Sequence, residues 1–262
     1  MIKANKSLGQ NFLIDEDVIN KIVNYLKIED ETLLEVGPGT GNLTSSLLKK
    51  KPQKLIVVEK DDRLVSMLQK KFQNEILIIN DDILNVDENK LSKNKLIVFG
   101  NLPYNISTEI LCKWILNLSD ENLWFTNLIL MFQKEVANRI ISDFNLSSYG
   151  RLTILANWKL DIKRILDVKP ESFSPKPKIE SSLLIFKPKK NFFKFKNPYN
   201  LEKVTRVFFS QRRKMIKKPF KLLFPNNQDL LEKLNINLNL RPQNLNLETY
   251  YELTREYEKL RS

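Results

Sequence analysis

Short apolar runs alternate with amphipathic stretches along roughly the first 185 residues of the chain. Seven of these runs have the length and composition of β-strands, and they lie at Thr32–Val36, Lys54–Glu59, Glu75–Asn80, Leu96–Phe99, Leu128–Phe132, Trp158–Leu166 and Ser182–Phe186. Amphipathic segments that we expect to be helices lie between them, at Leu43–Lys51, Arg63–Phe72, Thr108–Leu118 and Lys134–Ser142. Alternation of this kind predicts βαβ units and a mostly parallel, doubly wound sheet.

The first four apolar runs are nearly continuous, as expected for strands that helices cover on both faces. The last two runs, Trp158–Leu166 and Ser182–Phe186, have no convincing helical pattern between them. That arrangement suits an antiparallel hairpin at one edge of the sheet. The pattern therefore predicts an α/β fold with seven strands, most of them parallel.

The pattern changes near Lys187, where we place a domain boundary. Three prolines, at positions 175, 177 and 188, punctuate the end of the α/β region. Beyond them the apolar positions recur at helical spacing, in segments at Leu201–Lys217, Gln228–Leu234 and Leu247–Leu260. We therefore expect an α/β domain over residues 1–187 and a small all-α domain over residues 188–262.

The formal charge of +12 is concentrated in one stretch of the sequence. Between Lys187 and Lys218 the chain has twelve Lys or Arg residues and a single acidic residue, Glu202, a net charge of +11. Such a local excess indicates a surface that binds a polyanion, either nucleic acid or an anionic membrane. Aromatic residues interleave these charges and favour a folded nucleic-acid surface over a disordered tail; they are Phe192, Phe193, Phe195, Tyr199, Phe208 and Phe209.

Composition excludes several classes of function. The chain has no histidine and one cysteine, which removes His-assisted nucleophiles and intramolecular disulfides and argues against a transition-metal site. No apolar run approaches the roughly 20 residues of a membrane helix, and the N-terminus lacks the apolar region of a signal peptide. We therefore expect a cytoplasmic protein that binds neither a membrane nor a metal.

Three of the six glycines fall within five residues, in Gly37-Pro38-Gly39-Thr40-Gly41, between a predicted strand and a predicted helix. Glycine permits positive φ and lets the backbone approach a ligand closely. A dinucleotide fingerprint has the spacing G-x-G-x-x-G. Here the spacing is G-x-G-x-G after the acidic Glu35, which resembles the first motif of class I S-adenosylmethionine-dependent methyltransferases. A carboxylate beside this loop suits a cofactor that carries a sulfonium and an amine rather than phosphates.

Two acidic positions follow the next two predicted strands. Glu59 ends the second strand, where a carboxylate can accept hydrogen bonds from both hydroxyls of a ribose. Asp82 follows the third strand and is placed to accept a hydrogen bond from an adenine amino group of the cofactor. Asp81 is the rival at that position, and the sequence alone does not separate the two neighbours.

The fourth predicted strand runs into Asn101-Leu102-Pro103-Tyr104. In an open α/β sheet, ligands bind beyond the carboxyl ends of the strands. The tetrapeptide resembles the amino-methyltransferase motif (Asp/Asn/Ser)-Pro-Pro-(Tyr/Phe), with Leu102 in place of the first proline. The Asn101 side-chain carbonyl and a backbone carbonyl near Leu102 can accept the two hydrogens of an aromatic amine. Pro103 fixes the turn, and Tyr104 can stack on an extruded base.

These motifs together resemble the KsgA family of ribosomal RNA adenine dimethyltransferases. The match is collinear over nearly the whole chain, and the segments that carry it are Ser7–Asp15, Glu35–Gly41, Gly100–Ser107, Tyr149–Leu152, Phe173–Ser181 and Phe209–Lys214. The resemblance implies a Rossmann-like class I methyltransferase domain, a small helical C-terminal domain and S-adenosylmethionine as the cofactor. It also implies dimethylation of two adjacent adenines near the 3′ end of small-subunit rRNA, during ribosome assembly.

The resemblance also assigns roles to individual residues. Its cofactor pocket would contain Asn11, Leu13, Gly37, Gly39, Glu59, Asp82 and Asn101. By the same carry-over, Phe173 would cover the second face of the target adenine. In the basic stretch we expect RNA contacts from Arg212, Arg213, Lys214 and Lys217. The expected partner is the small-subunit rRNA or its precursor particle, bound by a monomer.

Three other functions compete with this interpretation. Erm-type enzymes, which methylate large-subunit rRNA, share much of the motif set but usually carry Ile where Leu102 stands. An RNA-binding assembly factor could keep the fold while catalysis is secondary, although intact Glu59, Asp82 and Asn101 argue against a degenerate site. An NAD-dependent oxidoreductase does not fit the spacing of the glycine loop.

Overall fold

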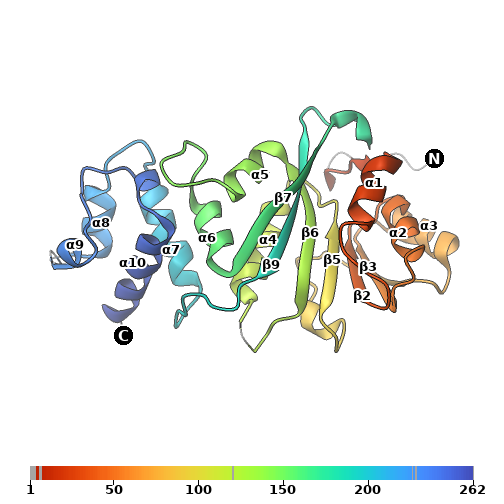
Figure 1. Ribbon diagram of the computed structural model, residues 1–262, viewed down its shortest axis with the longest axis horizontal. Helices are drawn as coiled ribbons and strands as arrows, with labels where there is room; N and C mark the ends of the chain where they lie inside the picture. Colours follow the sequence, from red (N-terminus) through yellow and green to blue (C-terminus); the bar gives the residue numbers. More distant parts are fainter. Residues whose placement is uncertain (1–3, 6–7, 120, 226, 228, 262) are drawn as a thin grey trace. The chain divides into compact units, whose positions relative to one another are not determined.

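The computed structural model describes the chain except for residues 1–3, 6–7, 120, 226, 228 and 262 (Figure 1). The chain forms two compact units, each built from separate segments. The first unit comprises Met1–Lys113, Leu118–Ala137 and Asp161–Pro188, and the second comprises Trp114–Asn117, Asn138–Leu160 and Lys189–Ser262. The second unit therefore takes in residues 138–160, which the division at residue 187 had assigned to the α/β domain.

A seven-stranded sheet forms the centre of the α/β region, in the order β4-β3-β2-β5-β6-β9-β7. The strands are β2 (Thr32–Val36), β3 (Lys54–Glu59), β4 (Leu77–Asn80), β5 (Leu96–Gly100), β6 (Phe125–Gln133), β7 (Leu160–Val168) and β9 (Ser181–Pro188). The pairs from β4 to β6 are parallel, whereas β9 runs antiparallel to β6. The predicted α/β class is confirmed, and β9 and β7 lie side by side at one edge (Figure 1).

Burial along the strands follows their place in the sheet. The central strands β2 and β5 are buried along their whole length, as expected of strands that are covered on both faces. The third predicted strand differs, because β4 lies at the other edge of the sheet and Leu77 is 46% exposed. An edge strand has a neighbour on one side alone, so full burial is not required of it.

In the described part of the chain, five helices belong wholly or mostly to the first unit: α1 (Glu16–Val23), α2 (Asn42–Leu48), α3 (Asp62–Phe72), α4 (Ser107–Asn117) and α5 (Lys134–Ile140). The helix α1 was not predicted; it begins where Asp15 accepts a hydrogen bond from Val18 N at 3.1 Å. A two-stranded ribbon pairs β1 (Phe12–Leu13) with β8 (Phe173–Ser174). Among the residues that the structure describes, 3-10 turns also lie at Glu88–Lys90 and Pro170–Ser172.

The second unit is helical. Its helices are α6 (Arg151–Lys159), α7 (Tyr199–Phe209), α8 (Lys217–Leu223), α9 (Asp229–Lys233) and α10 (Leu247–Lys259), with a 3-10 turn at Pro242–Asn244. Most of the aromatic residues that interleave the basic stretch pack inside this unit: Phe208 lies 5.6 Å from Tyr250, and Phe193 lies 5.2 Å from Tyr251, between ring centroids. Their main contribution is therefore packing, although Tyr199 is exposed.

Several predicted elements are wrong in their extent; the strand predicted over Leu128–Phe132, for example, is observed as Phe125–Gln133. The helix expected over Leu201–Lys217 ends at Phe209, and a turn held by the bond from Lys214 N to Gln211 O at 2.8 Å precedes α8. The strand expected from Trp158 begins at Leu160, after α6. Because α6 buries residues on nearly all its faces, its sequence lacks the 3.6-residue alternation by which a helix is recognised. The helix expected over Gln228–Leu234 begins at a residue outside the described part of the chain.

Among the described residues, no helix combines the length and the apolar character that a membrane crossing requires.

Candidate active site

A cavity opens at the carboxyl ends of β2, β3, β4 and β5, all in the first unit. Its volume is about 1240 Å³, which includes open solvent at its mouth. The segment that precedes and forms β1, residues 8–13, supplies a further wall. Ten of the predicted site residues line this cavity: Asn11, Leu13, Gly37, Gly39, Glu59, Asp82, Asn101, Leu102, Pro103 and Tyr104. The predicted cofactor loop (Gly37–Gly41, the glycine loop) and the predicted catalytic turn (Asn101–Tyr104) thus share one site.

The glycine loop adopts the backbone conformation that its composition predicts. Gly37, Gly39 and Gly41 have φ values of +69°, +58° and +74°, in the region that favours glycine. A Cβ atom on Gly39 would lie 2.7 Å from Cδ1 of Phe12, so β1 packs directly on the loop. A Cβ on Gly37 would approach the carbonyl oxygen of Asn101 to 3.7 Å. The loop therefore packs against β1 at Gly39 and lies beside the carbonyl oxygen of Asn101 at Gly37.

Two buried carboxylates lie beneath the loop. Thr44 Oγ1 donates to Glu35 Oε2 at 2.6 Å, and burial raises the pKa of Glu35 to about 7, with Glu59 adding to the rise and Thr44 opposing it. Glu59 accepts backbone hydrogen bonds from Gly39 N at 3.3 Å and from Lys60 N and Asp61 N at 3.0 Å each. Burial raises the pKa of Glu59 as well, although these three bonds oppose the shift. The bonds fix the carboxylate at the end of β3.

Both aspartates after β4 line the cavity. Asp82 Oδ2 pairs with Lys60 Nζ at 2.7 Å, and Asp82 Oδ1 accepts from Leu84 N at 3.0 Å. Burial acts to raise the pKa of Asp82, but the bonds from Lys60 and Leu84 outweigh it and leave the pKa lowered. Asp81 is exposed and accepts from Asp82 N at 2.6 Å. Asp82 is thus the more enclosed of the two neighbours.

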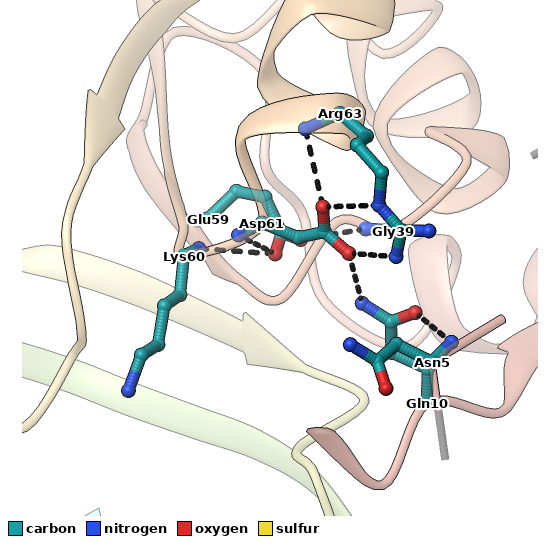
Figure 2. A network of polar contacts seen from close by, with 7 residues as sticks. All are labelled: Asn5, Gln10, Gly39, Glu59, Lys60, Asp61 and Arg63. Carbon is teal, nitrogen blue, oxygen red and sulfur yellow. Dashed lines mark hydrogen bonds and ion pairs between the residues drawn. The ribbon is translucent and has the colours of Figure 1, made fainter. Parts of the chain in front are cut away.

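A polar network ties the N-terminal segment to the end of β3 (Figure 2). Gln10 Nε2 donates to Asp61 Oδ2 at 2.9 Å, and Gln10 Oε1 accepts from Asn5 N at 2.7 Å. The same Asp61 carboxylate binds the Arg63 guanidinium at 2.9 and 2.5 Å. The Arg63 contact is the main reason why the pKa of Asp61 falls to about 2. Asp61 therefore stays ionised and holds Gln10 in the cavity wall.

The side chain of Asn101 has a defined direction. Its Nδ2 donates to the backbone oxygen of Asn11 at 2.7 Å. The opposite end of the amide, Oδ1, then remains available as an acceptor. Asn42 Nδ2 donates to the oxygen of Leu13 at 2.9 Å and ties the same segment to the start of α2. Residues 10–13 thus connect the catalytic turn, the glycine loop and the end of β3.

The remaining residues of the turn, Leu102, Pro103 and Tyr104, differ in their surroundings. Leu102 is 1% exposed, and its Cδ2 packs so closely over Gly100 that a Cβ there would lie 2.7 Å away. Pro103 O accepts from Ile106 N at 3.1 Å and closes the turn before α4. The Tyr104 hydroxyl lies 2.5 Å from Ser181 Oγ. Burial raises the pKa of Tyr104, so its phenol stays protonated at neutral pH.

Phe173 lies outside the cavity, although it contacts one of the residues that line it. It is 3% exposed, pairs with Leu13 across the β1–β8 ribbon and belongs to the apolar core of the first unit. It is not among the described residues that line the cavity. Its predicted contact with a target base is thus absent from this arrangement of the side chains.

The predicted RNA-binding residues of the second unit also divide into two kinds. Arg213, Lys214 and Lys217 are exposed and line a shallow depression together with Lys218, Lys221, Arg241 and Met215. Arg212 instead donates to two backbone oxygens, that of Ser147 and that of Tyr149 at 2.6 Å. Arg212 therefore holds the loop before α6, whereas the other three side chains face solvent.

Four residues in or beside the cavity lining were not predicted from the sequence: Gln10, Lys60, Asp61 and Ser181. Asp61 gave no signal of its own, because an Asp before a helix is common as an N-cap, and it does accept from Arg63 N at 3.1 Å. Gln10 and Ser181 lie inside segments that were singled out, but their partners are 51 and 77 residues away. Such pairs become visible only when the strands are assembled.

The described residues contain no cluster of three or more Cys, Asp or Glu side chains arranged to hold a metal ion.

Comparison with known proteins gives one consistent result. A family model described as ribosomal RNA adenine dimethylase matches residues 1–259. The chain is 65% identical to ribosomal RNA small subunit methyltransferase A of Pelagibacter ubique (strain HTCC1062), over 99% of both chains. It is 40% identical to the protein of that name from Ehrlichia ruminantium (strain Gardel), over 97% of both.

Two solved structures share the fold over most of the chain. A dimethyladenosine transferase from Plasmodium falciparum matches with a TM-score of 0.80 and 28% identity, over 95% of this chain and 98% of that one. The 23S rRNA methyltransferase ErmE matches with a TM-score of 0.68 and 21% identity, over 95% of this chain and all of that one. At that identity the second likeness shows the fold alone.

Proposed function

Because the chain belongs to the ribosomal RNA adenine dimethylase family, we propose that it dimethylates the exocyclic 6-amino groups of two adjacent adenosines near the 3′ end of small-subunit rRNA. The observation that carries the proposal is the 65% identity, over 99% of both chains, to a protein named for small-subunit rRNA methylation. The polar residues of the cavity support turnover rather than binding alone, since Glu59, Asp82 and Asn101 are present together. The proposed partner is the small-subunit precursor, bound by a monomer in the cytoplasm.

The cavity suits S-adenosylmethionine by the chemistry of its walls. Among the described residues, four carboxyl groups line it, from Glu35, Glu59, Asp81 and Asp82, against one ammonium group, that of Lys60. Burial raises the pKa of Glu35 to about 7, so the negative charge comes mainly from the other three. This excess of negative charge fits a cofactor with a sulfonium and an amine, and it opposes a pyrophosphate. Glu59 would hold the ribose hydroxyls and Asp82 the adenine amino group. Asn11, Leu13, Gly37 and Gly39 would enclose the rest.

The bound cofactor would supply an electrophilic methyl group. The chain would supply orientation: Asn101 Oδ1 and the backbone carbonyl near Leu102 accept the two amine hydrogens, so that the nitrogen presents its lone pair. The bond from Asn101 Nδ2 to Asn11 O keeps Oδ1 turned to this task. Pro103 fixes the turn, and the neutral Tyr104 ring stacks on the extruded base. The product nitrogen is acidic enough to lose its proton without a histidine.

We also propose roles in RNA binding for Phe173 and for basic residues of the second unit. Phe173 would cover the second face of the adenine, which requires its side chain to leave the core on substrate binding. The second unit would dock the RNA through Arg213, Lys214 and Lys217, which face solvent. Arg212 would support that surface through its bonds to the loop before α6.

The target subunit is tested directly by methyl transfer. Purified protein and labelled S-adenosylmethionine are incubated with small or large ribosomal subunits from cells that lack the respective adenine methylation. We expect label in the small subunit alone. Label in the large subunit would favour the Erm-type alternative. Tight binding of the small subunit without transfer of label would favour an assembly factor.

A further inference from the structure

The segment Phe173–Ser181 marks the family, yet the cavity does not contain Phe173. The other end of the segment reaches the catalytic turn instead, since the Tyr104 hydroxyl lies 2.5 Å from Ser181 Oγ. Ser181 is fully buried at the first position of β9. We propose that Ser181 is a positioning residue for catalysis, which holds the Tyr104 ring in the orientation that stacks on the target adenine. This inference rests on the proposed role of Tyr104.

The Tyr104 ring is held at both of its ends. At the backbone end, the bonds from Ile106 N to Pro103 O at 3.1 Å and from Ser107 Oγ to Tyr104 O at 3.3 Å fix the turn. A tyrosine side chain could still rotate about two torsions from that fixed point. The contact with Ser181 removes this freedom at the hydroxyl end. The ring is therefore set before any base arrives, as a stacking surface requires.

Ser181 itself is firmly placed by the sheet. It pairs with Gln133 across the antiparallel β6–β9 ladder. The preceding residue, Glu180, accepts from Lys134 N at 2.9 Å through its backbone oxygen, and its carboxylate binds Lys134 Nζ at 2.6 Å. A hydroxyl at the start of β9, an interior strand between β6 and β7, is a fixed reference point. Through its contact with Tyr104, it fixes the catalytic turn relative to the sheet, although the two residues are 77 positions apart in the sequence.

The neighbouring Ser182 provides a matched control. It is also fully buried on β9, but successive residues of a strand point to opposite faces. Its hydroxyl donates to Asp167 Oδ1 at 2.6 Å, away from Tyr104. Ser182→Ala therefore removes a buried hydroxyl of the same kind without touching the catalytic turn. If kcat falls in Ser181→Ala but not in Ser182→Ala, the decrease is not a general effect of removing a buried serine hydroxyl.

The test is a double-mutant cycle on methyl transfer to undermethylated small subunits. We expect Tyr104→Phe and Ser181→Ala each to lower kcat roughly tenfold, the order expected when one positioning hydrogen bond is lost. The double variant should be no slower than either single one. KM for the subunit and the affinity for S-adenosylmethionine should stay within about twofold, and Ser182→Ala should keep its kcat. If Ser181→Ala fails to fold, Ser181→Cys keeps the size of the side chain and weakens the bond.

Three results would overturn the inference: a normal kcat for Ser181→Ala, a normal kcat for Tyr104→Phe, or losses that add in the double variant. Tyr104→Ala separates this failure from a failure of the proposed function. If Tyr104→Ala is slow while Tyr104→Phe and Ser181→Ala are normal, the ring matters and the tether does not. If Tyr104→Ala is normal too, the proposed stacking role fails with it.

Discussion

Single residues decide which atoms the catalytic turn presents to its substrate. Asn101 could display either end of its amide, and the backbone oxygen of Asn11 fixes the choice by accepting from Nδ2 at 2.7 Å. In the proposed mechanism, the N-terminal segment is thus part of the catalytic geometry as well as of the cofactor pocket. Leu102 shows the opposite case, since its side chain is buried and only its backbone can take part.

Asn101→Ala removes the proposed acceptor of the amine hydrogens. We expect methyl transfer to fall by at least about 100-fold, the scale seen when one preorganised polar group of an active site is removed. The affinity for S-adenosylmethionine should change little, because the carboxylates remain. Single-turnover transfer and equilibrium titration of the cofactor measure the two effects separately. Near-normal turnover would disprove the catalytic role of Asn101.

Glu35 predicts a pH-dependent stability. Burial raises its pKa from 4.5 to about 7, so the folded chain holds this proton more tightly than the unfolded chain does. The contribution of Glu35 to stability is therefore full below pH 4.5 and is lost as the pH rises towards 7, by about 1.4 kcal/mol per pH unit at most. Urea unfolding of the cofactor-free protein should show that Glu35→Gln gains stability relative to the wild type over this range. A difference that does not vary with pH would contradict the shift.

At the scale of elements, the glycine loop and β1 pack against each other. The loop requires positive φ at Gly37 and Gly39 alike, but the space around them differs. A Cβ on Gly39 would meet the Phe12 ring at 2.7 Å, whereas a Cβ on Gly37 would meet nothing closer than 3.7 Å. Strain in the backbone and crowding against β1 can thus be separated experimentally.

Gly37→Ala and Gly39→Ala form a matched pair. Both should lose roughly 1–2 kcal/mol of stability to the left-handed backbone conformation. Gly39→Ala should lose more, because Phe12 must move, and its affinity for S-adenosylmethionine should fall further as β1 shifts. Thermal unfolding and cofactor titration of both variants check this order. Equal losses would show that the packing of Phe12 on the loop does not matter.

Many of the helices and strands could be predicted, because apolar runs and helical periodicity are properties of the local sequence. The strands β2 and β3 have the bounds that their apolar runs predict. The helix α6 could not be recognised, because burial on nearly all its faces removes its periodicity. In the site, the spacing of the motifs was enough to predict that Gly37, Glu59 and Asn101 line one cavity. The pairs Gln10–Asp61 and Tyr104–Ser181 depend on assembled strands, so no local pattern contains them.

For the whole molecule, the distribution of charge matters more than its total. Nearly all of the net charge of +12 comes from the stretch Lys187–Lys218, which carries +11. The sequence locates this basic region but not the task of each cation in it. In the second unit Arg213, Lys214 and Lys217 are exposed, while Arg212 is bonded to backbone oxygens. The first three side chains are free to contact the phosphates of an RNA. Arg212 instead stabilises the loop before α6.

Replacing Arg213, Lys214 and Lys217 with Ala should weaken binding of the small subunit and flatten its salt dependence. The slope of log K against log salt should fall by about 0.7 to 0.9 for each phosphate contact that is lost. Arg212→Ala should instead lower the thermal stability, since it frees the loop before α6. Filter binding over a range of salt concentrations, with thermal unfolding of each variant, distinguishes the two effects. An unchanged salt slope in the triple variant would mean that RNA docks elsewhere.

The central claim concerns one nitrogen atom of adenine. Small-subunit rRNA from undermethylated cells is reacted with the purified protein and S-adenosylmethionine, then digested, and its modified nucleosides and their positions are determined by mass spectrometry. The account predicts two adjacent N6,N6-dimethyladenosines near the 3′ end, and neither of them with Asn101→Ala. Methyl groups on ring nitrogens, on another base or at scattered adenines would contradict it.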